Sequence, residues 1–135
     1  MSVVIDASVA LCWCFDDESS PRTEALLDRV ARDGALVPIL WYFELGNVLL
    51  QAERRGRIKT ADVAARLELI GALPIVTDQD SAGRIWREVL ALARSHRLTT
   101  YDAAYLDLAI HRAMPLATND GDLIKAAKSV GVELV

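Results

Sequence analysis

Four carboxylate residues occupy positions from which they could act together in catalysis or metal binding: Asp6, Glu44, Asp102 and Asp120. Glu44 is the most unusual of them, because it is the only charged residue between Pro38 and Ala52. Burying an unpaired charge among apolar side chains is energetically expensive. The carboxylate of Glu44 therefore either points to water on a polar stripe or faces a group that offsets this cost. A cation is the obvious candidate.

The elements that position these acids are read from the hydrophobic pattern. Short apolar runs predict strands at 2–5, 35–38, 74–77 and 115–118, with a last short strand in "VELV" at the end of the chain. Helical periodicity predicts six helices at 7–15, 20–34, 40–54, 81–98, 101–113 and 122–131, and another that begins at a cap on Thr60. Alternating strands and helices predict one α/β domain over residues 1–135, with a parallel sheet of four to five short strands and helices on both faces.

Active sites in such sheets form outside the carboxyl ends of the strands. Asp6 directly follows the first strand, Asp120 follows "PLAT" by one residue, and Asp102 opens a helix. Each position also has a purely structural explanation, because Asp is a favoured helix cap and suits a helix N-terminus. Glu44 could lie on a solvated helix face. Asp6 is the hardest to explain as a cap alone, because its strand starts the centre of the sheet.

The combination of acids indicates a hard divalent cation. Carboxylates gathered at one edge of a sheet repel each other and are partly protonated without a counter-charge. Mg²⁺ and Mn²⁺ prefer carboxylate and water oxygens, and the chain has no His or Cys cluster with zinc spacing. Such a site suits phosphate chemistry with a metal-activated water. Acid–base cleavage without metal by His96 and His111 is less favoured, because His111 lies mid-helix with no evident partner.

The net charge of −4 and the pI of about 5.1 argue against a protein that coats nucleic acid by charge alone. Basic residues nevertheless cluster locally, and each cluster could contact phosphates or stabilise a helix C-terminus. These clusters are Arg54, Arg55, Arg57 and Lys59; Arg94, His96 and Arg97; and Lys125 and Lys128. The last pair lies one turn after Asp120 and could border the acidic cleft.

The two cysteines, Cys12 and Cys14, are too close in sequence for an ordinary structural disulfide. We interpret them as small buried apolar residues, which fits a reducing cytosol. The apolar N-terminus contains Asp6 and lacks a basic region before it, so it predicts a strand and a helix rather than a signal peptide. No stretch reaches the roughly 18 uncharged apolar residues of a membrane span. We therefore expect a cytoplasmic protein without membrane contact.

Four stretches of the chain carry a family resemblance: "VVIDASVAL", "FELGNVLLQAERRGRI", "YDAAYLDLA" and "LATNDGDLIKAAKSVGV". Together, in order and spacing from Val3 to Val132, they resemble the PIN-domain ribonucleases, and among these the VapC toxins of toxin–antitoxin pairs. The resemblance implies a PIN fold and Mg²⁺- or Mn²⁺-dependent hydrolysis of RNA, with tRNA or rRNA as the target. It also implies a cognate VapB-type antitoxin and a homodimer, often formed through the third and fifth helices.

The resemblance assigns roles to particular residues. The acidic quartet of the family maps onto Asp6, Glu44, Asp102 and Asp120. The first, third and fourth of these would be the main metal ligands. Glu44 would ligate directly or through water, or orient the attacking water.

Three further residues match positions around the family's site. Asp122 would bind metal through water, or merely favour the first turn of its helix. Thr118 would border the site, or only end a strand. Ser8 would donate a hydrogen bond near the metal, or only cap a helix.

Other residues bear on the partner and on departures from the family pattern. Trp13, Phe15, Trp41 and Tyr42 could line an antitoxin groove, although such aromatics are more often core. Asn119 stands where the family often has an apolar residue. Asp107 is an extra acid five positions after Asp102, on a different helical face, and we expect it outside the site.

Two other functions remain as alternatives. A receiver-like signalling domain would need adjacent acids after the first strand and a Lys after the last strand, and the sequence has neither. A non-catalytic binding module would use the acids only as helix caps, and would bind no divalent metal.

Overall fold

The computed structural model describes residues 2–135 and contains a four-stranded parallel sheet in the order β3-β2-β1-β4. The strands are β1 (Val3–Ile5), β2 (Ala35–Val37), β3 (Ile75–Thr77) and β4 (Leu116–Ala117). All three strand pairs are parallel. The predicted α/β class with a central parallel sheet is confirmed. The predicted fifth strand is reduced to one isolated bridge between Leu116 and Leu134.

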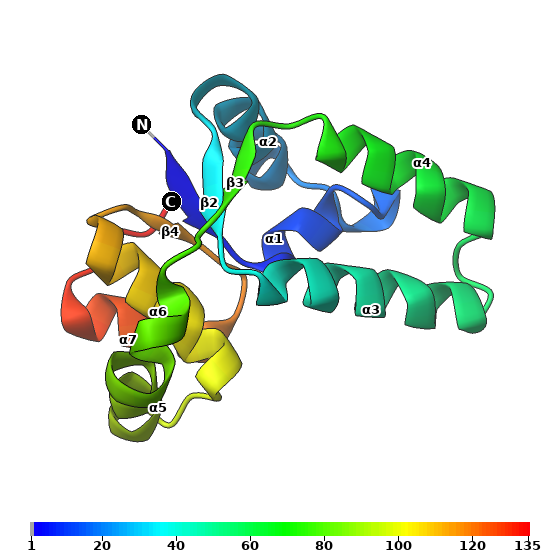
Figure 1. Ribbon diagram of the computed structural model, residues 1–135. Helices are drawn as coiled ribbons and strands as arrows, with labels where there is room; N and C mark the ends of the chain where they lie inside the picture. The colour runs from blue at the N-terminus through cyan, green and yellow to red at the C-terminus, as the bar shows by residue number, and fades with distance from the viewer. Residues whose placement is uncertain (1) are drawn as a thin grey trace.

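The direction in which strands are added to the sheet reverses between β1 and β4. From β1 the chain moves outward to β2 and β3, and it then returns to add β4 on the other side of β1. Right-handed crossovers put the helices before and after this return on opposite faces of the sheet. Figure 1 shows α1 to α4 on one side and α5 to α7 on the other. Asp6 and Thr118 follow the two strands at this reversal.

Seven α-helices cover the sheet within the described residues: α1 (Ala7–Cys12), α2 (Pro21–Asp33), α3 (Leu40–Arg54), α4 (Thr60–Gly71), α5 (Leu90–His96), α6 (Thr100–Arg112) and α7 (Gly121–Val130). The helix that carries Glu44 has the bounds predicted from the sequence. Thr60 is the first residue of α4 and its cap is Lys59, so the predicted cap was one residue late. Gly34 ends α2 with a φ of 84°, and a Cβ there would lie 3.0 Å from the Pro74 carbonyl oxygen.

The prediction of one continuous helix over 81–98 is wrong. This segment consists of a 3-10 turn (Ser81–Arg84), a π-helical turn (Ile85–Val89) and α5. Arg84 is anchored by Asp107 at 2.9 Å and Asp78 at 3.5 Å. A few residues later, Val89 packs against α6 in a separate apolar cluster. We attribute the π turn to these two fixed contacts, which a regular helical spacing would not satisfy together.

The main core lies between the sheet and the apolar faces of the helices. Val3, Val4 and Ile5 of β1 are fully buried. Phe15 and Trp41 also belong to this core, and each borders a surface hollow. Helices α3 and α6 supply further large core residues: Leu45, Leu49, Tyr105, Leu106 and Leu108. The core therefore holds β1, which precedes Asp6, at the centre of the fold.

The other aromatics and the cysteines differ in burial. Trp13 is partly buried and donates its indole N–H to the Thr23 carbonyl oxygen at 2.8 Å. Tyr42 is exposed. Cys14 is buried, as expected, and burial raises the pKa of its thiol to about 11. Cys12 is only partly buried. Neither cysteine forms a disulfide.

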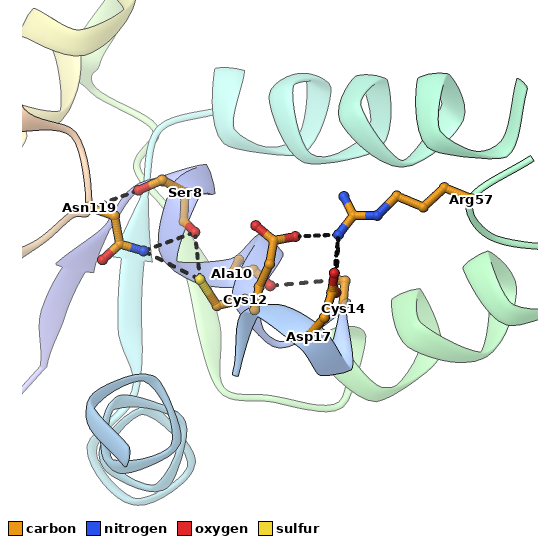
Figure 2. A network of polar contacts seen from close by, with 8 residues as sticks. Ser8, Ala10, Cys12, Cys14, Asp17, Arg57 and Asn119 are labelled. Carbon is orange, nitrogen blue, oxygen red and sulfur yellow. Dashed lines mark hydrogen bonds and ion pairs between the residues drawn. The ribbon is translucent and has the colours of Figure 1, made fainter. Parts of the chain in front are cut away.

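Helices α3 and α4 run side by side as a hairpin that extends away from the sheet (Figure 1). The connection between them is tied to the N-terminal part of the chain by Arg57. Its guanidinium pairs with Asp17 (Figure 2) and with Glu18. It also lies 3.9 Å from the centre of the Phe15 ring. Over residues 2–135, no helix has both the length and the hydrophobicity that crossing a bilayer requires.

Arg84→Ala should destabilise the fold by about 2–3 kcal/mol, because it leaves the buried carboxylates of Asp78 and Asp107 without this partner. Urea unfolding of the variant measures this change in the free energy of unfolding. Arg87→Ala is the matched control, since Arg87 is exposed on the next turn and should change stability by less than about 0.5 kcal/mol. Equal effects of the two substitutions would contradict the anchoring role of Arg84.

Candidate active site

Asp6 is held rigidly at the carboxyl end of β1. It is the N-cap of α1, and its Oδ1 accepts hydrogen bonds from the Val9 amide at 3.3 Å and the Ser8 hydroxyl at 2.6 Å. Thr118, which follows β4, donates its hydroxyl to the other carboxylate oxygen. The residue is only 5% exposed. Both oxygens are thus oriented by the fold, and Asp6 is at once a helix cap and a buried acid.

Thr118 connects Asp6 to Asp120 across the reversal between β1 and β4. The hydroxyl that donates to Asp6 also accepts the backbone N–H of Asp120 at 3.0 Å. Asp120 in turn caps α7 by accepting the Leu123 amide at 2.9 Å. One buried hydroxyl therefore fixes the spacing of two acids that are far apart in the sequence.

Glu44 and Asp102 come together through α6. The Tyr105 hydroxyl donates to Glu44 Oε1 at 2.5 Å, and the Tyr105 side chain is almost fully buried. Asp102 lies three residues earlier in α6, on the same side of the helix as Tyr105. Thr99, rather than Asp102, is the N-cap of α6, with its hydroxyl 3.1 Å from the Asp102 amide.

Burial and mutual repulsion raise the pKa of three of the four acids. Burial is the largest cause for Asp6, and the charge of Asp120 adds to it. Burial also raises the pKa of Glu44, followed by the charges of Asp102 and Asp6. The pKa of Asp102 rises through burial and then through Asp120, Asp6 and the exposed Asp122. The structure therefore brings the predicted quartet into one electrostatic group, with Asp122 at its edge.

Among residues 2–135, no cationic side chain pairs with the group. Across the part of the chain that the structure describes, no Lys or Arg forms an ion pair with any member of the quartet. A divalent cation fits this donor set, because carboxylate oxygens are its preferred protein ligands. Within the same residues, no three acidic, thiol or imidazole groups lie close enough to hold a metal ion by themselves. Such a set suits Mg²⁺, which commonly keeps several waters beside one or two carboxylates.

Comparison with known proteins supplies the family. A profile of the PIN domain family matches residues 3–129, which is nearly the whole chain. The chain belongs to the PIN domain family. It is 28% identical over 123 residues to "Ribonuclease VapC3" of Pyrobaculum aerophilum, covering 91% of this chain and 92% of that protein.

Solved structures agree with this fold. PAE2754 from Pyrobaculum aerophilum has a TM-score of 0.69 and 24% identity, over 93% of this chain and 84% of that one. FitAcB from Neisseria gonorrhoeae has a TM-score of 0.57 and 18% identity, over 98% of this chain and 95% of that one. A structure of FitAB bound to an IR36 DNA fragment gives a TM-score of 0.59 and 19% identity, over 98% of this chain and 93% of that one. At these identities, the similarity shows the shared fold.

Sequence reasoning about this PIN domain did not identify Tyr105. The available signal was a tyrosine three positions after Asp102, on the same helical face as a suspected site acid. Asp107, expected outside the site, is buried and accepts a hydrogen bond from Arg84 at 2.9 Å. Ser8 and Thr118 both donate to Asp6, so their contacts go beyond those of a simple cap or strand end.

Asn119, the departure from the PIN pattern, fastens the loop between β4 and α7 to α1 and α2. Its amide donates to the Ser8 carbonyl at 3.3 Å and to Cys12 Sγ at 3.4 Å, and its backbone N–H donates to Ser8 Oγ (Figure 2). Its side-chain oxygen accepts a hydrogen bond from the Arg22 guanidinium at 2.5 Å, and Arg22 also donates a hydrogen bond to the Thr118 carbonyl. The polar replacement thus reinforces the contact between the two halves of the acidic site.

Thr118→Val should cost about 1–3 kcal/mol of stability, because it leaves buried acceptor and donor groups of Asp6 and Asp120 without a partner. It should also raise the pKa of Asp6 further, since a hydrogen bond to the charged form is removed. Thr118→Ser keeps the hydroxyl and is the control. Urea unfolding and NMR titration of the Asp6 carboxyl carbon measure both effects. If the Val and Ser variants behave alike, the hydroxyl does not connect the two acids.

Asp102→Asn should stabilise the metal-free protein at neutral pH. The folded-state pKa of Asp102 is raised above its usual 3.8, so the folded protein binds this proton more tightly than the unfolded chain. Ionisation therefore costs stability as the pH rises through the folded pKa, and this cost is absent below the unfolded pKa. The gain should be about 1 kcal/mol or less, because solvent screens this partly exposed group.

Thermal unfolding in a chelator, at neutral and acidic pH, measures this gain. The difference from wild type should vanish in acid. Asp28→Asn, at an exposed position on α2, is the control and should change stability by less than about 0.5 kcal/mol. An Asp102→Asn variant that is less stable than wild type at neutral pH would show that its charge is compensated within the protein.

Proposed function

We propose that this PIN domain, as one unit over residues 1–135, is a metal-dependent endoribonuclease that hydrolyses RNA phosphodiester bonds. The observation that carries the proposal is the group of four mutually repelling carboxylates at the sheet reversal, with no protein cation to balance it across residues 2–135. Such a group costs stability. A function that needs a cation, Mg²⁺ or Mn²⁺, explains why the fold builds it.

The relative named Ribonuclease VapC3 supports the choice of RNA as substrate, since it matches this chain over nearly its full length. The same relative and the sequence resemblance support a role as the toxin of a toxin–antitoxin pair. A VapB-type antitoxin would then be the protein partner, tRNA or rRNA the target, and a homodimer the assembly, in the cytoplasm.

We assign the acids to separate tasks. Asp6, Asp102 and Asp120 would hold the ion, one or two of them directly and the rest through coordinated water, and the hydrogen bonds from Ser8 and Thr118 would keep Asp6 oriented toward it. When bound, the ion would polarise a phosphoryl oxygen and lower the pKa of a coordinated water. Asp122, at the edge of the site, would bind the ion through a water molecule.

Glu44 would act on the attacking water, by ligation or by orienting it. Tyr105 occupies Oε1 of Glu44, which leaves Oε2 to accept a hydrogen bond from that water. The raised pKa of Glu44, caused first by burial, brings its basicity closer to neutral pH. Tyr105 fixes the carboxylate position, and burial together with Glu44 raises the pKa of its own phenol, so it stays protonated as a donor.

Cleavage of a labelled RNA with Mg²⁺ or Mn²⁺ tests the proposal. Wild type should cut, while Asp6→Asn and Glu44→Gln should slow cleavage by about 10²-fold or more, the range for losing a group that acts in the chemical step. Calorimetric titration of Mn²⁺ should show weaker binding in Asp6→Asn. Asp28→Asn should match wild type in both assays. An Asp6→Asn protein that cuts as fast as wild type would contradict the proposal, and wild type that neither binds metal nor cuts RNA would favour the acids as helix caps alone.

A further inference from the structure

A hollow of about 500 Å³ adjoins the acidic group on the side of α5 and α7. It is lined mainly by Ser95, His96 and Arg97 at the end of α5 and by Asp122, Lys125 and Ser129 of α7. Asp122 belongs to both places, because it lines the hollow and its charge acts on Asp102. Asp122 therefore places the hollow next to the acidic site.

The cations of this hollow are free to bind a ligand. Arg97 and Lys125 are exposed, and neither forms an ion pair with an acid among residues 2–135. By contrast, Arg57, Arg66 and Arg84 each pair with a carboxylate. In a chain of net charge −4, a gathering of unpaired cations beside an acidic group is the arrangement that an anionic polymer needs to approach it.

The backbone at Arg97 ties the hollow to the acidic site. Arg97 is the C-cap of α5 and has a φ of 54°, a left-handed conformation that glycine or asparagine adopts more readily. The turn closes with a hydrogen bond from the Leu98 amide to the Ala93 carbonyl at 3.0 Å. Thr99 follows as the N-cap of α6 and holds the first turn, which carries Asp102. The same short turn thus places a cation in the hollow and an acid in the site.

A second basic hollow is a weaker candidate. It is lined by Arg22, Thr118, Asn119 and Lys128, among others, on another side of α7. There Arg22 already donates hydrogen bonds to Asn119, to the Thr118 carbonyl and to the Val135 carbonyl. The hydrogen bonds of its guanidinium are therefore used within the protein. Of the two cations that line this hollow, only Lys128 is left to contact a ligand.

We propose that the hollow between α5 and α7 binds a backbone phosphate of the RNA strand next to the phosphodiester that is cut. Arg97 and Lys125 supply the charge, and the hydroxyls of Ser95 and Ser129 supply hydrogen-bond donors. Contacts of this kind position a strand without reading its sequence. This inference rests on the proposed ribonuclease function, for which it names the path of the substrate.

The test compares two double variants in a Glu44→Gln background, which slows cleavage during the binding measurement when Mg²⁺ is present. Arg97→Asn with Lys125→Gln removes both charges, and Asn tolerates the left-handed backbone at 97. Arg94→Gln with Lys128→Gln is the matched control, with the same charge change on the same two helices but at residues that do not line this hollow. The probe is a fluorescein-labelled single-stranded RNA of about 20 nucleotides, followed by anisotropy over a range of salt.

The Arg97/Lys125 variant should bind the probe about 10-fold or more weakly, and its salt slope should fall by about 0.7 for each phosphate that it no longer neutralises. When the Arg97/Lys125 variant keeps Glu44, its KM for RNA should rise, while its kcat at saturation and its affinity for Mn²⁺ stay near those of wild type. The control variant should bind within about twofold of its parent, as surface changes away from the binding site do.

The remaining outcomes overturn the inference in distinguishable ways. Unchanged binding and KM in the Arg97/Lys125 variant of an active enzyme would overturn the inference and leave the ribonuclease function standing. A greater loss of RNA affinity in the Arg94/Lys128 control would place the RNA path elsewhere. A parent protein that neither binds nor cuts RNA would overturn the function and the inference together.

Discussion

The acidic site depends on one hydroxyl, that of Thr118. It donates to Asp6 and accepts the backbone N–H of Asp120, so it joins the ends of β1 and β4 where the sheet reverses. Carboxylates placed this close oppose each other, and only a fold that fixes each of them separately keeps them together. Ser8 and Val9 fix Asp6, and Tyr105 fixes Glu44. The Arg22–Asn119 contacts then hold the β4–α7 loop in place.

These constraints give the site a cost in stability that the proposed function explains. The pKa values of Asp6, Glu44 and Asp102 are raised, so ionisation at neutral pH works against the folded state. A bound divalent cation would remove that cost by favouring the charged forms. The unpaired cations of the adjoining α5–α7 hollow suit a polyanionic substrate better than they suit internal pairing. Under the proposed function, the acids that would hold a metal and the cations that would contact RNA occupy adjoining surfaces.

Much of this arrangement could be predicted from local sequence signals. Apolar runs and turn residues located β1 to β4 and α3, and the rule that sites lie beyond the carboxyl ends of strands selected Asp6 and Asp120. The features that sequence signals did not predict depend on tertiary contacts. The segment expected as one regular helix over 81–98 changes from 3-10 to π to α geometry. We attribute this change to the contacts of Arg84 with Asp78, directly after β3, and with Asp107 of α6. The spacing of Tyr105 from Asp102 places both residues on one helical face, but the contact of Tyr105 with Glu44 depends on how α6 meets α3, which no local pattern encodes.

The central claim is that the carboxylate group exists to bind a divalent cation. A crystal structure of the wild-type protein grown with Mn²⁺, with anomalous scattering recorded for that metal, tests it most directly. We predict an anomalous peak among the carboxylates of Asp6, Asp102 and Asp120, and its disappearance in the Asp6→Asn crystal. A well-ordered Asp6 group without a Mn²⁺ peak, or a peak that persists unchanged in the variant, would contradict this claim.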